Sequence, residues 1–168
     1  VVFVVVESRV PDPMFRLNLF SIPAFSLGNL AGLMASISRG GLQFILIIWL
    51  QGIWLPRRGY SYESTPLWAS IFLLPLTVGF LVAGPLCGYL SDRYGARRFA
   101  VAGALVTAGS FLGLMVLPVD FPYWAFALLT FVNGVGSGVF SSPNAAMVMN
   151  SVPPAQRGVA SGMRMTFF

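Results

Sequence analysis

The stretch "GYLSDRYGARR", residues 88–98, places one acid and three arginines within eleven residues of a chain that is 57% hydrophobic and only 9% charged. Apolar runs flank it on both sides, over residues 66–90 and 99–117. About 20 apolar residues in a helix cross the roughly 30 Å hydrocarbon core of a bilayer, so each run is long enough for one span. The stretch therefore predicts two membrane helices joined by a charged turn.

The composition of the whole chain indicates a membrane protein. Its mean hydropathy is +0.80, it contains 15 Phe and 18 Gly, and all 10 of its basic residues are Arg. A net charge of +5 would suit a nucleic-acid partner in a soluble domain, but these arginines lie mostly between apolar runs, where they orient helices in the bilayer. We therefore predict no nucleic-acid partner.

The residue types of the chain do not favour an enzyme or a cofactor-binding protein. The chain has no His and a single Cys, Cys87, so neither a disulfide nor a metal site is expected. No pair of acids lies within an apolar run, and no phosphate-binding loop with its Lys occurs. The prediction is a protein without enzyme activity, metal or cofactor.

Further apolar runs extend the pattern on both sides of the charged stretch. Residues 20–55 and 123–149 are each long enough to cross the bilayer, and shorter runs at 1–6 and 158–168 are interpreted as parts of two more spans. We predict an all-α membrane protein in which residues 1–168 form a single transmembrane helical region. Because the chain lacks an initiator Met and stops within an apolar run, we expect it to be a fragment.

The run at 20–55 has an ambiguous length. As one helix its 36 residues would measure roughly 54 Å, which is long for one span and short for two, and "SRGG" at 38–41 could form a turn. A single helix puts six loop arginines on one side of the membrane and only Arg57 and Arg58 on the other, whereas two spans leave no such bias. We therefore predict one long helix, with residues 88–98 facing the cytoplasm.

A polar stripe follows this long helix. At 100° per residue its members project within a face of roughly 120°. They are Asn29, Gly32, Ser36, Arg39, Gln43 and Gln51. A charge near the middle of a membrane costs at least about 2.5 kcal/mol, so it usually faces a cavity, a water path or an acid. We predict that the five polar side chains of the stripe line a cavity; the alternatives for Arg39 are a structural pairing with a neighbouring helix or a place in a loop.

Glycines and aromatic residues suggest how the helices pack. Five pairs have the small-xxx-small spacing that allows close helix contact, either in a static bundle or between helices that rock in a transporter. They are Gly28/Gly32, Gly84/Gly88, Gly109/Gly113, Gly134/Gly138 and Gly158/Gly162. Near the proposed outer face, four aromatic residues are interpreted as a belt at the membrane interface, with drug contact as the alternative. These residues are Trp49, Trp54, Tyr60 and Trp68.

The charged stretch itself predicts a latch between two helices. Asp92 lies where one helix ends, and the short connection through Gly95 brings it near the start of the next. There a carboxylate can accept backbone N–H bonds and a charge-assisted bond from an arginine. The alternative is a plain orientation signal, for which Arg93, Arg97 and Arg98 suffice.

The same residues resemble a known family signature. "GYLSDRYGARR" is similar to the cytoplasmic loop of the major facilitator superfamily, G-x-L-a-D-r-x-G-r-[RK], which joins the second and third helices of each six-helix half. The residues on its positions are Gly88, Leu90, Asp92, Arg93, Gly95 and Arg97, followed by Arg98. Ala96 departs from the pattern, because the family usually has its first basic residue there. The resemblance implies that Gly88 permits close helix contact and that Asp92 stabilises one of the alternating states.

Longer segments resemble one branch of that superfamily, the fourteen-span drug/proton antiporters. The similar segments are "PMFRLNLF" at 13–20, "RGGLQFILIIWLQGIWLP" at 39–56, the run at 65–95 and "SSPNAAMVMNSVPPAQRGVASGM" at 141–163. The resemblance implies part of the six-helix C-terminal half of a multi-pass transporter in an inner or plasma membrane, which exports amphipathic organic compounds in exchange for protons. It also implies a missing N-terminal half, where the proton-carrying acid is expected because no complete span here contains Asp or Glu.

Two other functions fit the residues less well. A major facilitator that imports a sugar or an organic anion is the alternative within transport. A non-transporting membrane scaffold or sensor is the alternative of another class. A scaffold needs neither the polar stripe through Arg39 nor a latch at Asp92, so transport is preferred.

Overall fold

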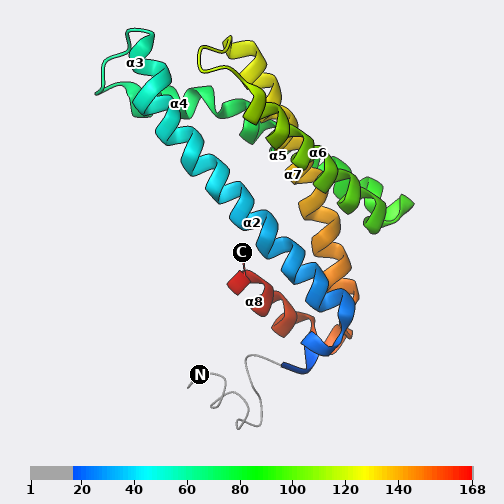
Figure 1. Ribbon diagram of the computed structural model, residues 1–168. Helices are drawn as coiled ribbons and strands as arrows, with labels where there is room; N and C mark the ends of the chain where they lie inside the picture. Colours follow the sequence, from blue (N-terminus) through cyan, green and yellow to red (C-terminus); the bar gives the residue numbers. More distant parts are fainter. Residues whose placement is uncertain (1–16, 168) are drawn as a thin grey trace, which may run out of the picture. The chain divides into compact units, whose positions relative to one another are not determined.

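The computed structural model describes residues 17–167, apart from the side chains of Leu17, Asp92 and Phe167, and within that range it is helical without a strand. Figure 1 shows the helices and their connections. The chain forms two compact units: a larger one from residues 37–144, and a smaller one from the described parts of 1–36 and 145–168. The partial span predicted at 1–6 lies outside the described residues.

Four helical runs among the described residues are long and apolar enough to cross a membrane. They are Pro23–Arg57, Thr65–Ser91, Ala96–Val116 and Tyr123–Asn150. Two of the connections contain glycines with positive φ, Gly59 at 85° and Gly95 at 97°, a conformation that glycine adopts without strain. The prediction of an all-α membrane protein is confirmed.

The run Pro23–Arg57 continues through "SRGG" without a break. It consists of α2 (Pro23–Trp49), the π-helical turn η2 (Leu50–Trp54) and the short α3 (Leu55–Arg57). Gly40 and Gly41 are helical, which satisfies their backbone hydrogen bonds where no water could do so. The wider π turn, which includes Gly52, changes the angular register of the residues that follow it.

The next run is interrupted by proline. α4 (Thr65–Phe72) and α5 (Leu74–Tyr94) are separated at Leu73, and Pro75 occupies the first turn of α5. Proline lacks an amide hydrogen and its ring clashes with the carbonyl four residues earlier, so it starts a helix more readily than it continues one. The sequence predicts a single span over 66–90; the structure breaks the helix at Leu73, and Thr65–Ser91 nevertheless forms one run of membrane length.

Glycines bring α7 (Tyr123–Asn150) against both α5 and α6 (Ala96–Val116), and the three helices lie side by side in Figure 1. A methyl group on Gly134 would overlap the carbonyl oxygen of Leu76 in α5. A methyl group on Gly136 would lie 2.8 Å from the backbone nitrogen of Thr107 in α6. Backbone therefore meets backbone on two sides of α7.

The small-xxx-small spacing identifies only part of these contacts. Gly138, the partner of Gly134 in the pattern, also faces α5, since a Cβ there would lie 2.9 Å from the carbonyl oxygen of Phe80. Gly79 and Gly103 make equally close backbone contacts with α7, although the pattern does not include them. Open space extends for 4 Å beside three glycines of the pattern: Gly109, Gly158 and Gly162.

A buried hydrogen bond also joins α6 to α7. Asn133 Nδ2 donates to Ser110 Oγ at 2.8 Å, and Ser110 Oγ donates in turn to the carbonyl oxygen of Thr107 at 2.7 Å. Asn133 and Ser110 are only 1% and 3% exposed. Because an unpaired amide is costly in an apolar interior, this bond favours one register of the two helices.

Aromatic side chains form a buried cluster where α2, η2 and α4 meet the connection between α6 and α7. Trp54 is 3% exposed and stacks on Phe121, with ring centroids 5.1 Å apart and an angle of 12° between the planes. The other aromatic residues that belong to the cluster or pack against it are Trp49, Tyr60, Trp68, Phe72, Phe111, Tyr123 and Phe126. The interpretation of an aromatic belt is therefore wrong for Trp54, which packs inside the protein rather than against lipid.

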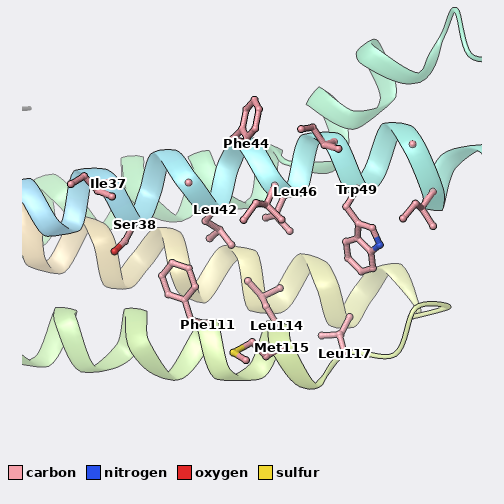
Figure 2. A pocket seen from close by; sticks show the side chains of 15 residues that line it. Ile37, Ser38, Leu42, Phe44, Leu46, Trp49, Phe111, Leu114, Met115 and Leu117 are labelled. Carbon is pink, nitrogen blue, oxygen red and sulfur yellow. The ribbon is translucent and has the colours of Figure 1, made fainter.

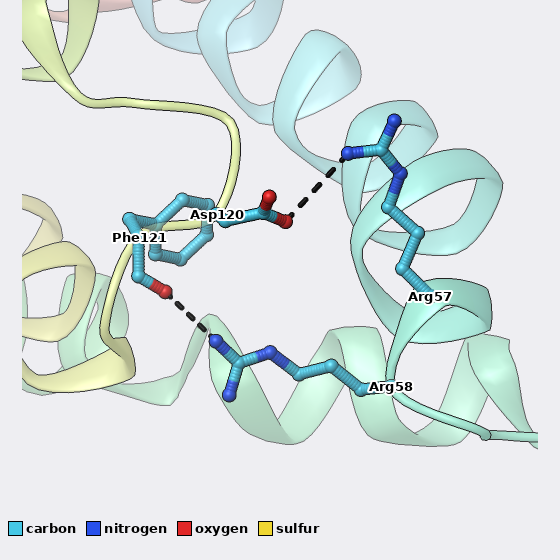
Figure 3. Close-up of polar contacts among 4 residues, drawn as sticks. All are labelled: Arg57, Arg58, Asp120 and Phe121. Carbon is cyan, nitrogen blue, oxygen red and sulfur yellow. Dashed lines mark hydrogen bonds and ion pairs between the residues drawn. The ribbon is translucent and has the colours of Figure 1, made fainter.

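Arg57 and Arg58 both contact the connection between α6 and α7 (Figure 3). Arg58 donates from Nη2 to the carbonyl oxygen of Phe121 at 3.0 Å, and its guanidinium carbon lies 4.2 Å from the ring centroid of Trp54. Arg57 pairs with Asp120 at 3.6 Å, but these side chains are 58% and 83% exposed. Exposed ion pairs contribute about 0–1 kcal/mol, so Arg58 is the stronger link between the two connections.

The smaller unit packs around its own apolar cluster. It contains η1 (Leu17–Ser21), the first turns of α2, the last turns of α7, η3 (Pro154–Gln156) and α8 (Arg157–Phe167). Its buried core residues are Leu19, Phe25, Val148, Val152, Ala160 and Met163. The cluster holds the end of α7 close to α8, across the short connection at 151–156.

Candidate functional site

The candidate site lies on α2, whose residues in the larger unit point in three directions. Leu42, Leu46 and Leu50 are buried and belong to the core that includes the aromatic cluster. A second face carries exposed apolar residues, among them Phe44 at 67% and Ile48 at 56%. The polar stripe borders the buried face on the side away from the groove described below, as the helical spacing of its members requires.

Arg39 is the charged member of the stripe. It is half-buried and lies close to the midpoint of the 35-residue run Pro23–Arg57. Its guanidinium carbon lies 4.0 Å from the ring centroid of Phe80 in α5, and no carboxylate among the described residues pairs with it. A desolvated cation–π contact contributes about 2 kcal/mol, against a cost of at least about 2.5 kcal/mol for the charge in mid-membrane. The charge is therefore only partly compensated.

Open space lies beside Arg39 on the stripe. Gly40 belongs to this side of α2 because it follows Ser36 by one turn and precedes Gln43 by nearly one. A Cβ on Gly40 would meet nothing within 4 Å, and the Gln43 side chain is exposed. Gln51, two turns beyond Gln43, is half-exposed. A ligand beside the guanidinium of Arg39 would therefore have both room and polar neighbours.

Three members of the stripe, Asn29, Gly32 and Ser36, belong to the smaller unit. Asn29 is 3% exposed and donates from Nδ2 to the carbonyl oxygen of Phe25 at 2.9 Å, one turn earlier in the same helix. Ser36 is half-exposed. The structure thus leaves Ser36, Arg39 and Gln43 accessible, whereas it buries Asn29.

An apolar groove of about 830 Å³ occupies a different face of α2, between that helix and α6. In Figure 2, Leu42 and Trp49 of α2 point toward Phe111 of α6 and toward Leu117, which follows α6. Ser38 supplies the one polar side chain of the lining. Such a lining suits lipid chains or the apolar side of another helix better than a ligand that needs hydrogen bonds. The groove and the stripe are therefore separate surfaces of α2.

The charged stretch 88–98 forms the turn between α5 and α6. α5 ends at Tyr94, Gly95 adopts φ 97° and ψ 120°, and α6 begins at Ala96. The amide of Gly95 donates to the carbonyl oxygen of Ser91 at 2.9 Å. A single residue therefore joins the two helices, and a side chain at that φ would be strained.

The remaining residues of the motif are mostly on the surface. Arg93, Arg97 and Arg98 are exposed, and Leu90 is partly exposed, at 38%. The side chain of Asp92 lies outside the described residues, so its role as a latch stays a prediction.

Gly88 does not mark the closest approach of α5 to α7. A Cβ on Gly88 would lie 3.7 Å from Ser142 Cβ, which is an ordinary van der Waals distance. The tight contacts lie earlier in α5, between Leu76 and Gly84, opposite Gly134 and Gly138. An alanine could therefore replace Gly88 in this arrangement without displacing α7.

Phe80 is the residue of the site that sequence reasoning missed. It is one of 15 phenylalanines and stands inside an apolar run, so no local pattern distinguishes it. Its contact with Arg39 depends on how α2 and α5 pack, which is a tertiary property. The neighbouring Gly79 is a usable signal, because a glycine inside a membrane helix often marks a close helix contact.

Comparisons with known proteins show to which family the chain belongs. The Major Facilitator Superfamily profile matches residues 11–168. A cephamycin export protein of Amycolatopsis lactamdurans is 32% identical over 98% of this chain. A methylenomycin A resistance protein of Streptomyces coelicolor is 27% identical over 94%, and a riboflavin transporter of Clostridioides difficile is 24% identical over 95%. No solved structure matches the chain significantly.

The match covers nearly all of this chain but only part of each relative. The chain spans 33% of the cephamycin export protein, 31% of the methylenomycin A resistance protein and 33% of the riboflavin transporter. The family profile, four membrane-length helices and the one-residue turn between α5 and α6 point to the same conclusion. The chain belongs to the major facilitator superfamily.

Proposed function

We propose that the full-length protein containing this chain is a secondary active transporter that exports amphipathic small organic molecules in exchange for protons. The observation that carries the proposal is the polar stripe of α2, with the half-buried Arg39 beside open space at Gly40. A polar side chain that serves packing bonds to a neighbouring helix, as Asn133 does to Ser110. No hydrogen bond joins Arg39 to another described helix, and a helix that borders a substrate cavity needs polar contacts.

The direction of transport is proposed from the names of relatives. Two of the relatives described above are named for cephamycin export and for methylenomycin A resistance. The third is named as a riboflavin transporter, without a direction. The cephamycin name states export, and a resistance protein is consistent with it. On this basis the direction we propose is export, by a member of the drug/proton antiporter branch with fourteen spans.

The proton-carrying group is proposed to lie elsewhere in the full-length protein. No Asp or Glu occurs within the four described spans, and a proton-coupled carrier needs an acid that can load and release a proton in the membrane. Since the chain spans about a third of its relatives, we assign it to the C-terminal half of a multi-pass protein of the inner or plasma membrane. The N-terminal half then completes the cavity along α2.

The turn between α5 and α6 is proposed to act as a cytoplasmic latch. Its tight geometry at Gly95 keeps the end of α5 next to the start of α6. A carboxylate at position 92 can bind helix-end amides and arginines there, which would stabilise one of the two alternating states. The residues assigned to this latch are Gly88, Leu90, Asp92, Arg93, Gly95, Arg97 and Arg98.

The test of the transport path compares two neighbouring glycines. Gly40 lies on the stripe, Gly41 lines the apolar groove, and a Cβ at either position meets nothing within 4 Å. In cells that produce the full-length protein, we expect Gly40→Leu to reduce uncoupler-sensitive efflux of an amphipathic fluorescent dye by about ten-fold or more, because the added side chain occupies the ligand's space. We expect Gly41→Leu to keep most of the activity.

Two results would contradict this proposal. Equal losses in Gly40→Leu and Gly41→Leu, at equal amounts of protein in the membrane, would remove the stripe from the transport path. Absence of uncoupler-sensitive efflux from cells with the unmodified protein would exclude proton-coupled export.

The latch is tested by removing one charge without changing the side-chain shape. We expect Asp92→Asn to abolish most of the efflux while the amount of protein in the membrane stays normal. Asp120→Asn is the matched control, since Asp120 is an exposed acid in the connection between α6 and α7. Unchanged efflux in Asp92→Asn would leave residues 88–98 as an orientation signal only.

A further inference from the structure

The guanidinium of Arg39 lies against the ring of Phe80 and makes no hydrogen bond to a described residue. The guanidinium carbon lies over the Phe80 ring, 4.0 Å from its centroid, and no described oxygen accepts a hydrogen bond from the group. A guanidinium carries five N–H donors in a planar fork that matches the two oxygens of a carboxylate. A cation–π contact uses the charge of the group but none of these donors.

Phe80 gives Arg39 a rigid support. The backbone of Phe80 touches α7 without intervening side chains: a Cβ on Gly138 would lie 2.9 Å from the Phe80 carbonyl oxygen, and one on Gly134 would lie 3.0 Å from the Phe80 nitrogen. The contact between α5 and α7 therefore fixes the backbone position from which the Phe80 ring projects. A guanidinium held over such a ring loses less freedom when a ligand binds, which favours affinity.

The surroundings of Arg39 favour a negative ligand. In the larger unit, the acids with described side chains are Glu63 and Asp120, and both are exposed in the connections beyond the helix ends. Asp120 already pairs with Arg57. In the low dielectric of the membrane interior, the charge of Arg39 attracts an anion and repels a cation more strongly than it would in water. Gly40 and Gln43 add open space and an amide beside it.

From this geometry we infer that Arg39 binds the carboxylate of the substrate through its donor fork, so that the transporter selects organic anions among amphipathic compounds. This inference rests on the proposed transport function and adds a substrate class to it. The body of the substrate lies along the stripe past Gly40 and Gln43. A carboxylate on another helix of the full-length protein is a second source of the same chemistry, and the experiment separates the two sources.

The experiment measures binding of two matched probes to the purified full-length protein. 7-Methoxycoumarin-3-carboxylate and 7-methoxycoumarin-3-carboxamide have the same fluorescent body and differ in one negative charge. We expect the unmodified protein to bind the carboxylate about ten-fold or more tightly than the carboxamide, because the amide cannot accept two charge-assisted bonds. Arg39→Gln should abolish this preference, and Arg39→Lys should keep only part of it, since it retains the charge without the fork.

Two further variants test the support of Arg39 and the specificity of the effect: Phe80→Leu and Arg57→Gln. Phe80→Leu removes the support while leaving the charge, so we expect weaker binding of the carboxylate and an unchanged affinity for the carboxamide. Arg57→Gln removes an exposed arginine at the end of the same helical run and should leave the preference intact.

Two outcomes would overturn the inference. One is equal binding of the two probes by the unmodified protein, including no measurable binding of either. The other is an Arg39→Gln variant that melts at a lower temperature and changes the affinity for both probes equally, because this result assigns Arg39 to a carboxylate on another helix. Since binding is measured without a proton gradient, loss of the proposed proton-coupled export would leave the carboxylate preference unaffected.

Discussion

Gly134 has no room for even one methyl group, because a Cβ there would overlap the carbonyl oxygen of Leu76. We expect Gly134→Ala to lower the free energy of unfolding by about 1–3 kcal/mol, the usual cost of forcing extra atoms into a packed interior. Thermal melting of the purified full-length protein in detergent measures the effect. Gly109→Ala is the control: its Cβ meets nothing within 4 Å, so equal melting temperatures for the two variants would contradict the backbone contact.

The bond between Asn133 and Ser110 predicts a coupling energy. A double-mutant cycle of Asn133→Ala and Ser110→Ala should give an interaction of about 0.5–1.5 kcal/mol, within the range measured for hydrogen bonds between membrane helices. The bond is short, at 2.8 Å, and both residues are almost completely buried. Additive effects of the two substitutions would show that the bond does not tie α6 to α7.

Residue identity alone predicts the glycine contacts incompletely. The spacing of four residues marks Gly134 and Gly138 correctly, but it misses Gly136, which faces α6 rather than α5. It also includes Gly109, although a Cβ there would meet no atom within 4 Å. Spacing tells which glycines share a face of one helix, whereas contact depends on which neighbour covers that face.

At the scale of elements, Trp54 links the π turn η2 to the connection between α6 and α7. Removing its ring leaves a cavity beside Phe121, so we expect Trp54→Ala to cost about 3–5 kcal/mol of unfolding free energy. Trp124→Ala provides the control, because Trp124 is 71% exposed whereas Trp54 is 3% exposed. Its cost should stay within about 0.5 kcal/mol. Comparable melting temperatures for the two variants would argue against a buried role for Trp54.

The positions of the membrane helices can be predicted largely from the apolar runs of the sequence. Four runs of membrane length occur near the positions expected from hydropathy, because hydrocarbon allows a spanning segment few conformations other than a helix. The hydropathy of the sequence does not reveal the break at Leu73 or the π turn at 50–54. Pro75 is a local signal for the first of these, but the burial of Trp54 depends on Phe121, which lies far along the chain.

At the scale of the whole molecule, the arginine distribution predicts the orientation. In a full-length protein in which every native cysteine, Cys87 included, is replaced by Ser, we expect a membrane-impermeant maleimide to label Ser61→Cys in intact cells. Arg97→Cys should react only after the cells are opened, because the positive-inside rule places residues 88–98 in the cytoplasm. Both positions are exposed, so accessibility does not limit the reaction. The reverse labelling pattern would show that the orientation is wrong.

The candidate site could be predicted in part from the sequence. Arg39 and Gln43 stand out because polar residues are rare in a membrane helix, and the structure leaves both accessible on one side of α2. Asn29 obeys the same spacing but is buried, and its amide bonds to the carbonyl oxygen of Phe25. Helical periodicity gives the direction of a side chain, while the neighbours that cover it come from the tertiary fold.

The backbone contacts around α7 have a mechanical consequence. Where Gly134 meets the backbone of Leu76 and Gly136 meets the backbone of Thr107, few side-chain torsions lie between the helices to absorb a displacement. A displacement of α7 is therefore transmitted directly to α5 and α6, and we expect the three helices to move as one rigid block. α2 meets this block through Leu42 and Leu46, which can change rotamer at small cost. We expect the helix that carries Arg39 to be the compliant part of this unit during the proposed transport cycle.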